Sequence, residues 1–256
     1  MPNNAFILLI SGLFAGLLAG LLGIGGGTVL VPLLVALKYT PLQAVATSSL
    51  AIVITSVSGS IQNWRMGYLD FNRVIFLAIP ALITAQLGVF LSNHLPNYIL
   101  LLSFGIFLII NILLGNLRQY LISSDNLTNG VNISPILARL ITGGLAGVLA
   151  GLFGIGGGVI MVPLQMLFLG ESIKVAIQTS LGVIVITAIS ACVGHALHGN
   201  VLFSVGIILG TGGLIGAQIS TRFLPKLPDR IVRLCFYGLL AILAVYTFYQ
   251  AWESYQ

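Results

Sequence analysis

The chain contains eight apolar runs that are each long enough to cross a lipid bilayer as a helix. About 20 residues, at a rise of roughly 1.5 Å each, span the hydrocarbon core of a membrane. Only 6% of the 256 residues are charged, whereas a soluble domain needs roughly a quarter to cover its surface. The sequence therefore predicts an all-α integral membrane protein and excludes a soluble enzyme. The predicted spans are 5–22, 42–62, 73–92, 97–117, 135–153, 174–196, 201–222 and 230–250.

A duplication relates the two halves of the chain. The segments 12–33 and 143–164 align without gaps, and fifteen of their 22 positions are identical, including GIGGG and a following proline. At the same offset of 131, Ser49 falls on Ser180. Later positions align at an offset of 132, after one inserted residue. The sequence thus predicts two homologous repeats of four spans each, and four crossings would give both repeats the same orientation in the membrane.

The predicted organisation follows from this duplication. We expect a first membrane repeat at 1–117, a polar linker at 118–134 and a second membrane repeat at 135–256. The linker is the most polar stretch of the chain. Pro135 is suited to the first position of the next helix, where its missing N–H group is not needed.

Each predicted repeat begins with a helix that ends in a glycine cluster. Glycine costs about 1 kcal/mol relative to alanine inside a helix, so four glycines within five positions should interrupt it. The apolar runs that follow, 28–38 and 159–169, reach only halfway across the hydrocarbon. Unwound backbone cannot face lipid, and a restarting half-helix directs free N–H groups toward the break. We expect an anion site between the breaks; close helix packing is the alternative interpretation. The glycines predicted to bind are Gly25, Gly26, Gly27, Gly156, Gly157 and Gly158.

Polar side chains follow each break inside the next span. Such hydroxyls and amides either line a transport pathway or join helices by hydrogen bonds. Gln178 stands where the alignment at offset 131 places Thr47, so the two halves of the site need not bind equivalently. The residues predicted to bind substrate are Thr47, Ser48, Ser49, Gln178, Thr179 and Ser180.

Gln86 and Gln218 occupy equivalent positions in the middle of two apolar spans. A primary amide in hydrocarbon needs hydrogen-bond partners. We expect these two amides to meet across the axis between the repeats and to flank the substrate. The alternative is that each amide is bonded to a neighbouring helix.

Charge and motif content limit the chemistry. The net charge of +5 comes from single Lys and Arg residues between apolar runs, which is typical of topology signals and not of nucleic-acid binding. No acidic residue lies in a span centre, which favours anions over cations as substrates. Hydrolase, metal-site and ATP-binding motifs do not occur, so we expect no catalytic residue, metal or cofactor. Eight spans would place six Lys and Arg on one side and four on the other, with both termini outside.

The sequence resembles the TauE/SafE (TSUP) family of membrane proteins. The resemblance rests on GLLAGLLGIGGGTVLVPLL with ATSSL, on GVLAGLFGIGGGVIMVPLQ with QTSLGV, and on the pair AQLGVFLSNHLP and AQISTRFLPKLP. It covers nearly the whole chain. It implies a multi-pass permease or exporter in the plasma membrane that carries sulfite, organosulfonates or related small anions. We expect alternating access around the two broken helices. An anion channel and a non-transporting membrane assembly protein remain alternatives, and association into a homo-oligomer is left open.

Overall fold

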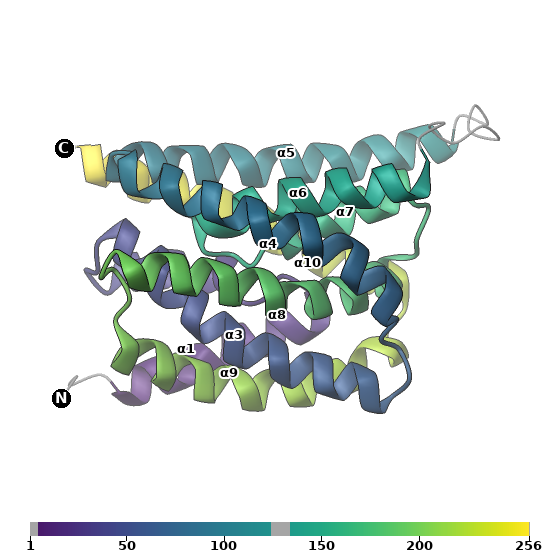
Figure 1. Ribbon diagram of the computed structural model, residues 1–256, viewed down its shortest axis with the longest axis horizontal. Coiled ribbons are helices and arrows are strands. Elements are labelled where there is room, and N and C mark those ends of the chain that lie inside the picture. The colour runs from purple at the N-terminus through teal and green to yellow at the C-terminus, as the bar shows by residue number, and fades with distance from the viewer. Residues whose placement is uncertain (1–4, 124–133, 256) are drawn as a thin grey trace.

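The computed structural model describes residues 5–123 and 134–255, and within these ranges the chain is built from helices (Figure 1). The helices are α1 (Ala5–Leu22), α2 (Gly27–Ala36), α3 (Pro41–Arg65), α4 (Phe71–His94), α5 (Asn97–Ser123), α6 (Pro135–Phe153), α7 (Gly158–Phe168), α8 (Ile173–Leu197), α9 (Phe203–Phe223), the short 3-10 helix η1 (Leu224–Lys226) and α10 (Asp229–Tyr255).

Eight of these helices are long and apolar enough to cross a membrane, and α2 and α7 are half that length. Large apolar side chains such as Ile83, Leu113 and Val245 are exposed on α4, α5 and α10. Exposed apolar surface on this scale is suited to lipid and not to water. The prediction of an all-helical, multi-pass membrane protein is therefore confirmed.

Local sequence explains where the helices begin. Thr40 caps α3 in a capping box with Gln43, and Asp70 accepts hydrogen bonds from the N–H groups of Asn72 and Arg73, the second and third residues of α4. Both arrangements satisfy N–H groups that a helix leaves unpaired at its start. Pro135 occupies the first position of α6, as expected. Helix α5 continues to Ser123, so the first six residues of the predicted linker are helical, and 124–133 lie outside the described residues.

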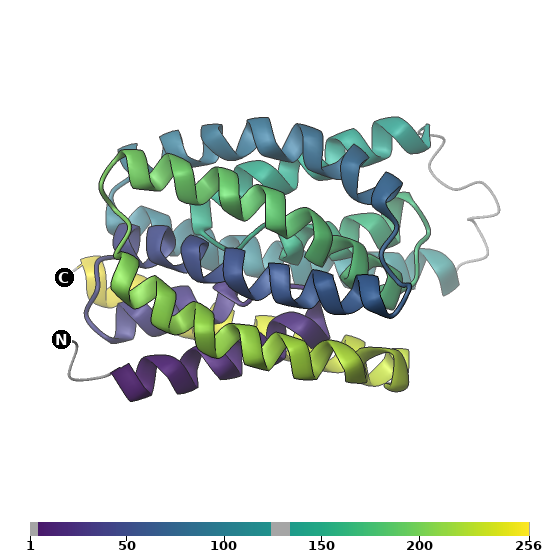
Figure 2. The same cartoon turned by 60° about the horizontal axis from the view of Figure 1, so that its bottom comes forward.

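The helices occur in the same order in both halves, and each half packs against the other. Helix α1 lies along α9, and α6 lies along α4. The glycine-rich faces of α1 and α6 permit this contact: a Cβ on Gly12 would collide with the carbonyl oxygen of Leu209, and a Cβ on Gly143 with that of Leu77. Small residues let membrane helices approach closely. The two halves are consequently interlocked (Figure 2).

The contacts also fix the directions of the helices. Ser58 contacts Leu214 and Gln62 contacts Gln218, so α3 and α9 run parallel. A short connection, 198–202, joins α8 to α9 as an antiparallel pair. Equivalent helices α3 and α8 therefore run in opposite directions. The expectation that both halves share one orientation is wrong: the halves are inverted.

The half-helices are the physical reason for this inversion. Helices α1 and α3 both run parallel to α9, so the chain must return between them, and α2 lies in that return. Each half consequently makes an odd number of net crossings. Helix α1 begins and α10 ends at the same end of the bundle (Figure 1), which we call the terminal end.

The inversion changes how the ten Lys and Arg residues are divided between the two ends of the bundle. The sequence predicts six on one side and four on the other. We call the opposite end, where α4, α6, α8 and α10 begin, the basic end, because nine of the ten Lys and Arg residues lie there. Lys38 alone lies at the terminal end. The six-against-four division is wrong because it counted every long helix as a crossing and omitted the return through α2 and α7. The nine are Arg65, Arg73, Arg118, Arg139, Lys174, Arg222, Lys226, Arg230 and Arg233.

Candidate functional site

The glycine clusters lie at the two turns between a long helix and a half-helix. Helix α1 ends at Leu22 and α2 begins at Gly27. In between, Gly23, Gly25 and Gly26 have φ angles of 68°, 70° and 85°. The corresponding φ angles of Gly154, Gly156 and Gly157 in the second half are 63°, 74° and 82°. Side chains rarely adopt this left-handed conformation, which explains the requirement for glycine at these positions.

The two turns contact each other inside the protein. A Cβ on Gly27 would collide with the carbonyl oxygen of Gly154, and a Cβ on Gly158 would collide with that of Gly23. All four residues are buried. Of the predicted site glycines, Gly27 and Gly158 thus contact the backbone of the other half, whereas Gly26 and Gly157 lie against Ala15 and Ala146 of their own halves.

Isoleucine side chains fill the space beside the turns. Ile52 of α3 and Ile184 of α8 lie next to Gly25 and Gly156 and form a small buried cluster with Ala188. Each isoleucine is one residue from the midpoint of a 25-residue helix. The contact between the turns therefore lies near the middle of the spanning helices.

Side chains from the core helices satisfy the carbonyl groups of the second turn. Ser48 Oγ donates to the Gly154 carbonyl at 2.8 Å, and Thr187 Oγ1 donates to the Gly156 carbonyl at 2.9 Å. His195 Nε2 lies 3.0 Å from the Gly151 carbonyl at the end of α6. Sequence reasoning did not assign these roles to Thr187 and His195. The signal available in the sequence was only that both are polar residues in the apolar span after the second break.

The other predicted hydroxyl and amide residues are buried, but their hydrogen bonds lead elsewhere. Thr47 accepts from the backbone N–H of Leu202 at 3.2 Å. Ser49 donates within its own helix, and Ser180 accepts from Gln165 of α7 at 3.1 Å. Gln178 and Thr179 are also buried. Of this predicted group, Ser48 is the residue that hydrogen-bonds to a turn.

The structure corrects the alignment of α3 with α8. Both helices have 25 residues, and their N-caps are Thr40 and Ser172, which are 132 positions apart. The inserted residue therefore precedes α8. Thr47 corresponds to Thr179, and Ser48 to Ser180, so the predicted pairing of Thr47 with Gln178 is wrong by one position. One helical position changes the face of a residue by about 100°.

Gln86 and Gln218 do not hydrogen-bond to each other. Gln86 Nε2 donates to the carbonyl and to Oγ of Ser190, both at 2.8 Å. Gln218 accepts from Ser58 Oγ at 3.2 Å and donates to Gln62 at 3.1 Å. Each amide thus joins one half to the other at equivalent positions. The expectation that the two amides meet is wrong, and hydrogen bonding to a neighbouring helix explains both.

Thr28 is a residue that sequence reasoning missed. It follows the glycines in the first turn of α2, where its side chain is fully buried and its hydroxyl has no hydrogen-bond partner. The aligned position in the second half is Val159. A buried hydroxyl without a partner is unfavourable, so its presence in one half alone is notable.

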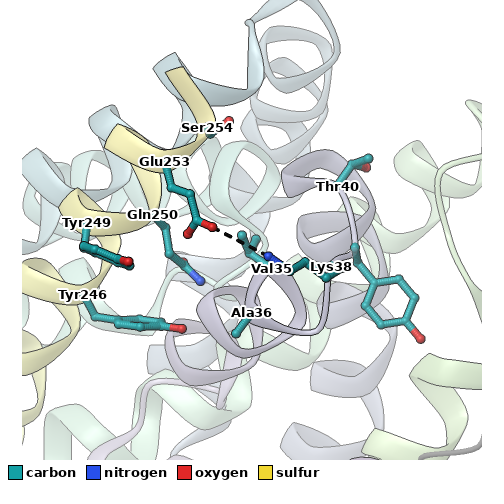
Figure 3. Close-up of a pocket in the computed structure, with 10 residues that line it drawn as sticks. Val35, Ala36, Lys38, Thr40, Tyr246, Tyr249, Gln250, Glu253 and Ser254 are labelled. Atoms are coloured by element: carbon teal, nitrogen blue, oxygen red, sulfur yellow. Dashed lines mark ion pairs between the residues drawn. The ribbon is translucent and has the colours of Figure 1, made fainter. Parts of the chain in front are cut away.

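A cavity of about 360 Å³ opens at the terminal end, beside the end of α2 (Figure 3). Lys38 and Glu253 face each other across it, with Nζ and Oε1 3.6 Å apart. Tyr246, Tyr249 and Gln250 of α10 contribute the opposite wall. Gln250 also donates to the carbonyl of Pro32 inside α2 at 2.8 Å. The cavity therefore borders the half-helix whose other end forms the buried turn.

Comparisons with known proteins relate the chain to membrane transporters. The family model described as "Sulfite exporter TauE/SafE" matches residues 8–247. The chain is 28% identical to "Probable membrane transporter protein YunE" of Bacillus subtilis, over 89% of this chain and 93% of that protein. It is 25% identical to "Probable membrane transporter protein MJ0441" of Methanocaldococcus jannaschii, over 94% of both. No solved structure matches the chain.

Proposed function

The chain belongs to the TauE/SafE sulfite exporter family of membrane transporters, and we propose that it carries small anions through a site between its two half-helices. Sulfite, organosulfonates and related sulfur-containing or organic anions are the proposed substrates. The observation that supports this most is the buried contact between the two glycine turns. It places the starts of both half-helices, whose first N–H groups have no partner within the helix, near the middle of the spanning helices.

The chemistry of the two turns suits an anion. The first N–H groups of α2 and α7 have no acceptor within their own helices. The start of each helix also carries a partial positive charge. Glycine lets a ligand approach this backbone closely. The Thr28 hydroxyl supplies a further buried donor at the start of α2.

Inverted halves support a mechanism of alternating access. Inverted repeats with interrupted helices around a central site are common in secondary transporters. In the present conformation Ile52 and Ile184 pack against the turns, so substrate binding requires the half-helices to separate from them. We propose that the cavity beside Lys38 is the entrance along α2 from the terminal end.

Replacing Thr28 with valine should weaken anion binding without destabilising the protein. Sulfite at about 100 times its dissociation constant should raise the free energy of unfolding by about 2.7 kcal/mol. Loss of one hydrogen bond to a charged ligand raises the dissociation constant about tenfold, which reduces that gain to about 1.4 kcal/mol. Thermal unfolding of the purified protein with sulfite, sulfate, acetate and chloride measures the effect. Valine is suitable because Val159 occupies the aligned position.

Thr142→Val is the matched control for Thr28→Val. Thr142 of α6 is equally buried and its hydroxyl also has no partner, but it lies three turns before the second break. We expect Thr142→Val to keep the full response to sulfite. Equal responses in the two variants would contradict the proposed role of Thr28, and the absence of any anion response in the wild type would contradict the anion site itself. Counterflow of labelled sulfite in proteoliposomes then distinguishes a carrier from a channel.

A further inference from the structure

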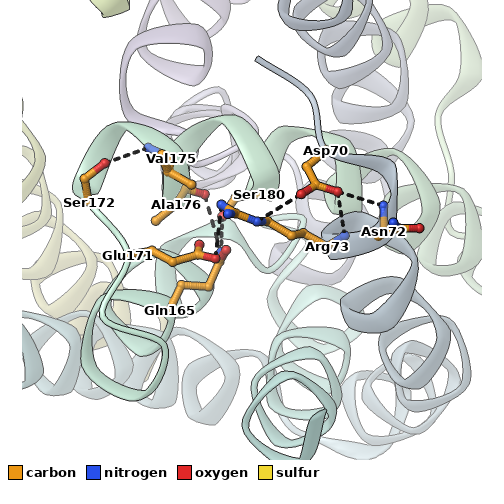
Figure 4. A network of polar contacts seen from close by, with 9 residues as sticks. All are labelled: Asp70, Asn72, Arg73, Gln165, Glu171, Ser172, Val175, Ala176 and Ser180. Carbon is orange, nitrogen blue, oxygen red and sulfur yellow. Dashed lines mark hydrogen bonds and ion pairs between the residues drawn. The ribbon is translucent and has the colours of Figure 1, made fainter. Parts of the chain in front are cut away.

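A cluster of charged side chains joins three helix ends at the basic end. Arg73, in the first turn of α4, lies between two carboxylates (Figure 4): its Nε is 3.1 Å from Asp70 Oδ2, and its Nη1 is 3.4 Å from Glu171 Oε1. Arg139 of α6 adds a second positive charge that acts on Glu171. The ion pair thus ties α4 to the connection between α7 and α8, and Arg139 of α6 acts on the same carboxyl group.

Glu171 differs by its burial from the other acidic residues that the structure describes. Its side chain is 10% exposed, whereas those of Asp70, Asp229 and Glu253 are 48%, 48% and 59% exposed. Loss of water around the carboxyl group raises the pKa of Glu171, and Asp70 adds to this increase. Arg73 and Arg139 oppose it without cancelling it. Lys174, the nearest charge on α8, is paired with Asp229.

Hydrogen bonds connect Glu171 to the interior. Its backbone N–H lies 3.4 Å from the carbonyl oxygen of Gln165 in α7. The Gln165 side chain is fully buried, and its Nε2 donates to Ser180 Oγ at 3.1 Å and to the Ala176 carbonyl at 3.4 Å. The connection that carries Glu171 is therefore linked to α7 directly and to α8 through Gln165, so its opening requires these hydrogen bonds to break.

The inverted half has no such cluster. The positions that correspond to Glu171, Arg73 and Arg139 are Tyr39, Val205 and Leu8, and none of these carries a charge. At the corresponding junction the first half has the cavity lined by Tyr39 and the exposed Lys38–Glu253 pair instead, so the scaffold forms there without a buried carboxylate. Because a carboxylate that is buried in an ion pair is weak evidence for stability, the occurrence of Glu171 at one end alone indicates a role other than holding the fold together.

We propose that Glu171 is the proton-carrying group of this transporter: its carboxyl group holds a proton while the basic end is closed and releases it when that end opens to water. The proton and the substrate then share one conformational change, since α7 carries the glycine turn at its other end. Arg73, which already lies 3.4 Å from the carboxyl group, and Arg139 stabilise the carboxylate that remains after the proton leaves. The transport arm of the test below rests on the proposed anion function, whereas its labelling arm does not.

The direction of the pH effect follows from the burial of the carboxyl group. Glu171 has a higher pKa in the closed state than in an open, hydrated state, so protonation favours closure. This preference is complete below the open-state pKa and disappears as the pH rises through the closed-state pKa. Opening of the basic end should therefore increase with pH, and a permanently neutral side chain should keep that end closed.

The labelling arm measures opening without any substrate. A single cysteine at Ser180, which is fully buried, is introduced after Cys192 and Cys235 are replaced by alanine. Its labelling by a water-soluble maleimide is compared with that of Tyr68→Cys, an exposed position at the same end, to correct for thiol ionisation. We expect the corrected rate to rise by about tenfold per pH unit across the titration. Glu171→Gln should keep it low throughout, and Asp229→Asn should leave the rise unchanged.

If the labelling rate of the Glu171→Gln variant kept its full dependence on pH, the proposal would be overturned. If Glu171→Gln does not fold, Glu171→Asp keeps a titratable group at a different distance from Arg73 and should shift the pH midpoint; an unchanged midpoint would also overturn it. Sulfite uptake into proteoliposomes supplies the transport arm, in which Glu171→Gln should abolish the pH dependence. If labelling depended on pH but no sulfite uptake occurred, this would contradict the proposed substrate and not the role of Glu171.

Discussion

Replacing Gly158 with alanine should destabilise the protein by several kcal/mol and abolish transport. Gly158 has an ordinary helical conformation at the start of α7 and no positive φ, so alanine would normally stabilise this position by up to about 1 kcal/mol. Here the added Cβ would collide with the Gly23 carbonyl oxygen and lie 2.7 Å from Ile184 Cδ1. Overpacking of a well-packed core typically costs about 1–3 kcal/mol. The carbonyl is backbone and cannot rotate away, so we expect the upper part of that range or more.

Gly238→Ala is the control for Gly158→Ala. Gly238 is also helical, in α10, but a Cβ there would meet nothing within 4 Å. We therefore expect this variant to be as stable as the wild type or slightly more stable. Denaturation in detergent, followed by circular dichroism, measures both variants, and sulfite counterflow measures function. If Gly158→Ala proved as stable as Gly238→Ala, the two glycine turns could not be in contact as the structure describes.

The spanning helices and the two interruptions could be predicted because each depends on local sequence. Runs of apolar residues determine the spans, and the glycines that follow Leu22 and Phe153 coincide with the ends of α1 and α6. Thr40 and Pro135 likewise indicate helix starts from single residues and their immediate neighbours. These features need no knowledge of tertiary contacts.

The orientation of the halves could not be predicted in the same way. A half-helix such as α2 can either continue across the membrane or return, and its ten apolar residues permit both. The choice depends on contacts such as that between Gly12 and Leu209, which are remote in sequence. Because of this one uncertainty, the topology predicted from sequence gives the second half the wrong orientation and places its charged loops at the wrong end.

The polar residues show a similar limit. Gln86 and Gln218 were recognised as equivalent, but their partners, Ser190 and Ser58, are also equivalent to each other and lie in the opposite half. This pairing of each glutamine with a serine of the opposite half follows from the interlocked packing, which the sequence does not show. Glu171 lies outside the apolar runs, in the connection between α7 and α8, and its burial beside Arg73 depends on a contact that is distant in sequence.

The distribution of positive charge predicts the orientation of the whole protein. Cytoplasmic loops of membrane proteins are enriched in Lys and Arg, and nine of these residues lie at the basic end, compared with Lys38 alone at the terminal end. An imbalance of this size favours one orientation strongly. We expect the basic end in the cytoplasm and the terminal end, with both chain termini, outside.

Two single-cysteine variants test this orientation in intact bacterial cells, after Cys192 and Cys235 are replaced by alanine. Ser254→Cys places an exposed thiol at the terminal end, and Tyr68→Cys places one at the basic end. A membrane-impermeant maleimide should label the Ser254 variant in intact cells and the Tyr68 variant only after permeabilisation. The result should be nearly all-or-none, because the thiol lies on one side of the membrane or the other. The opposite pattern would place nine positive charges outside, and would also mean that the proton held by Glu171 is released outside the cell and not into the cytoplasm.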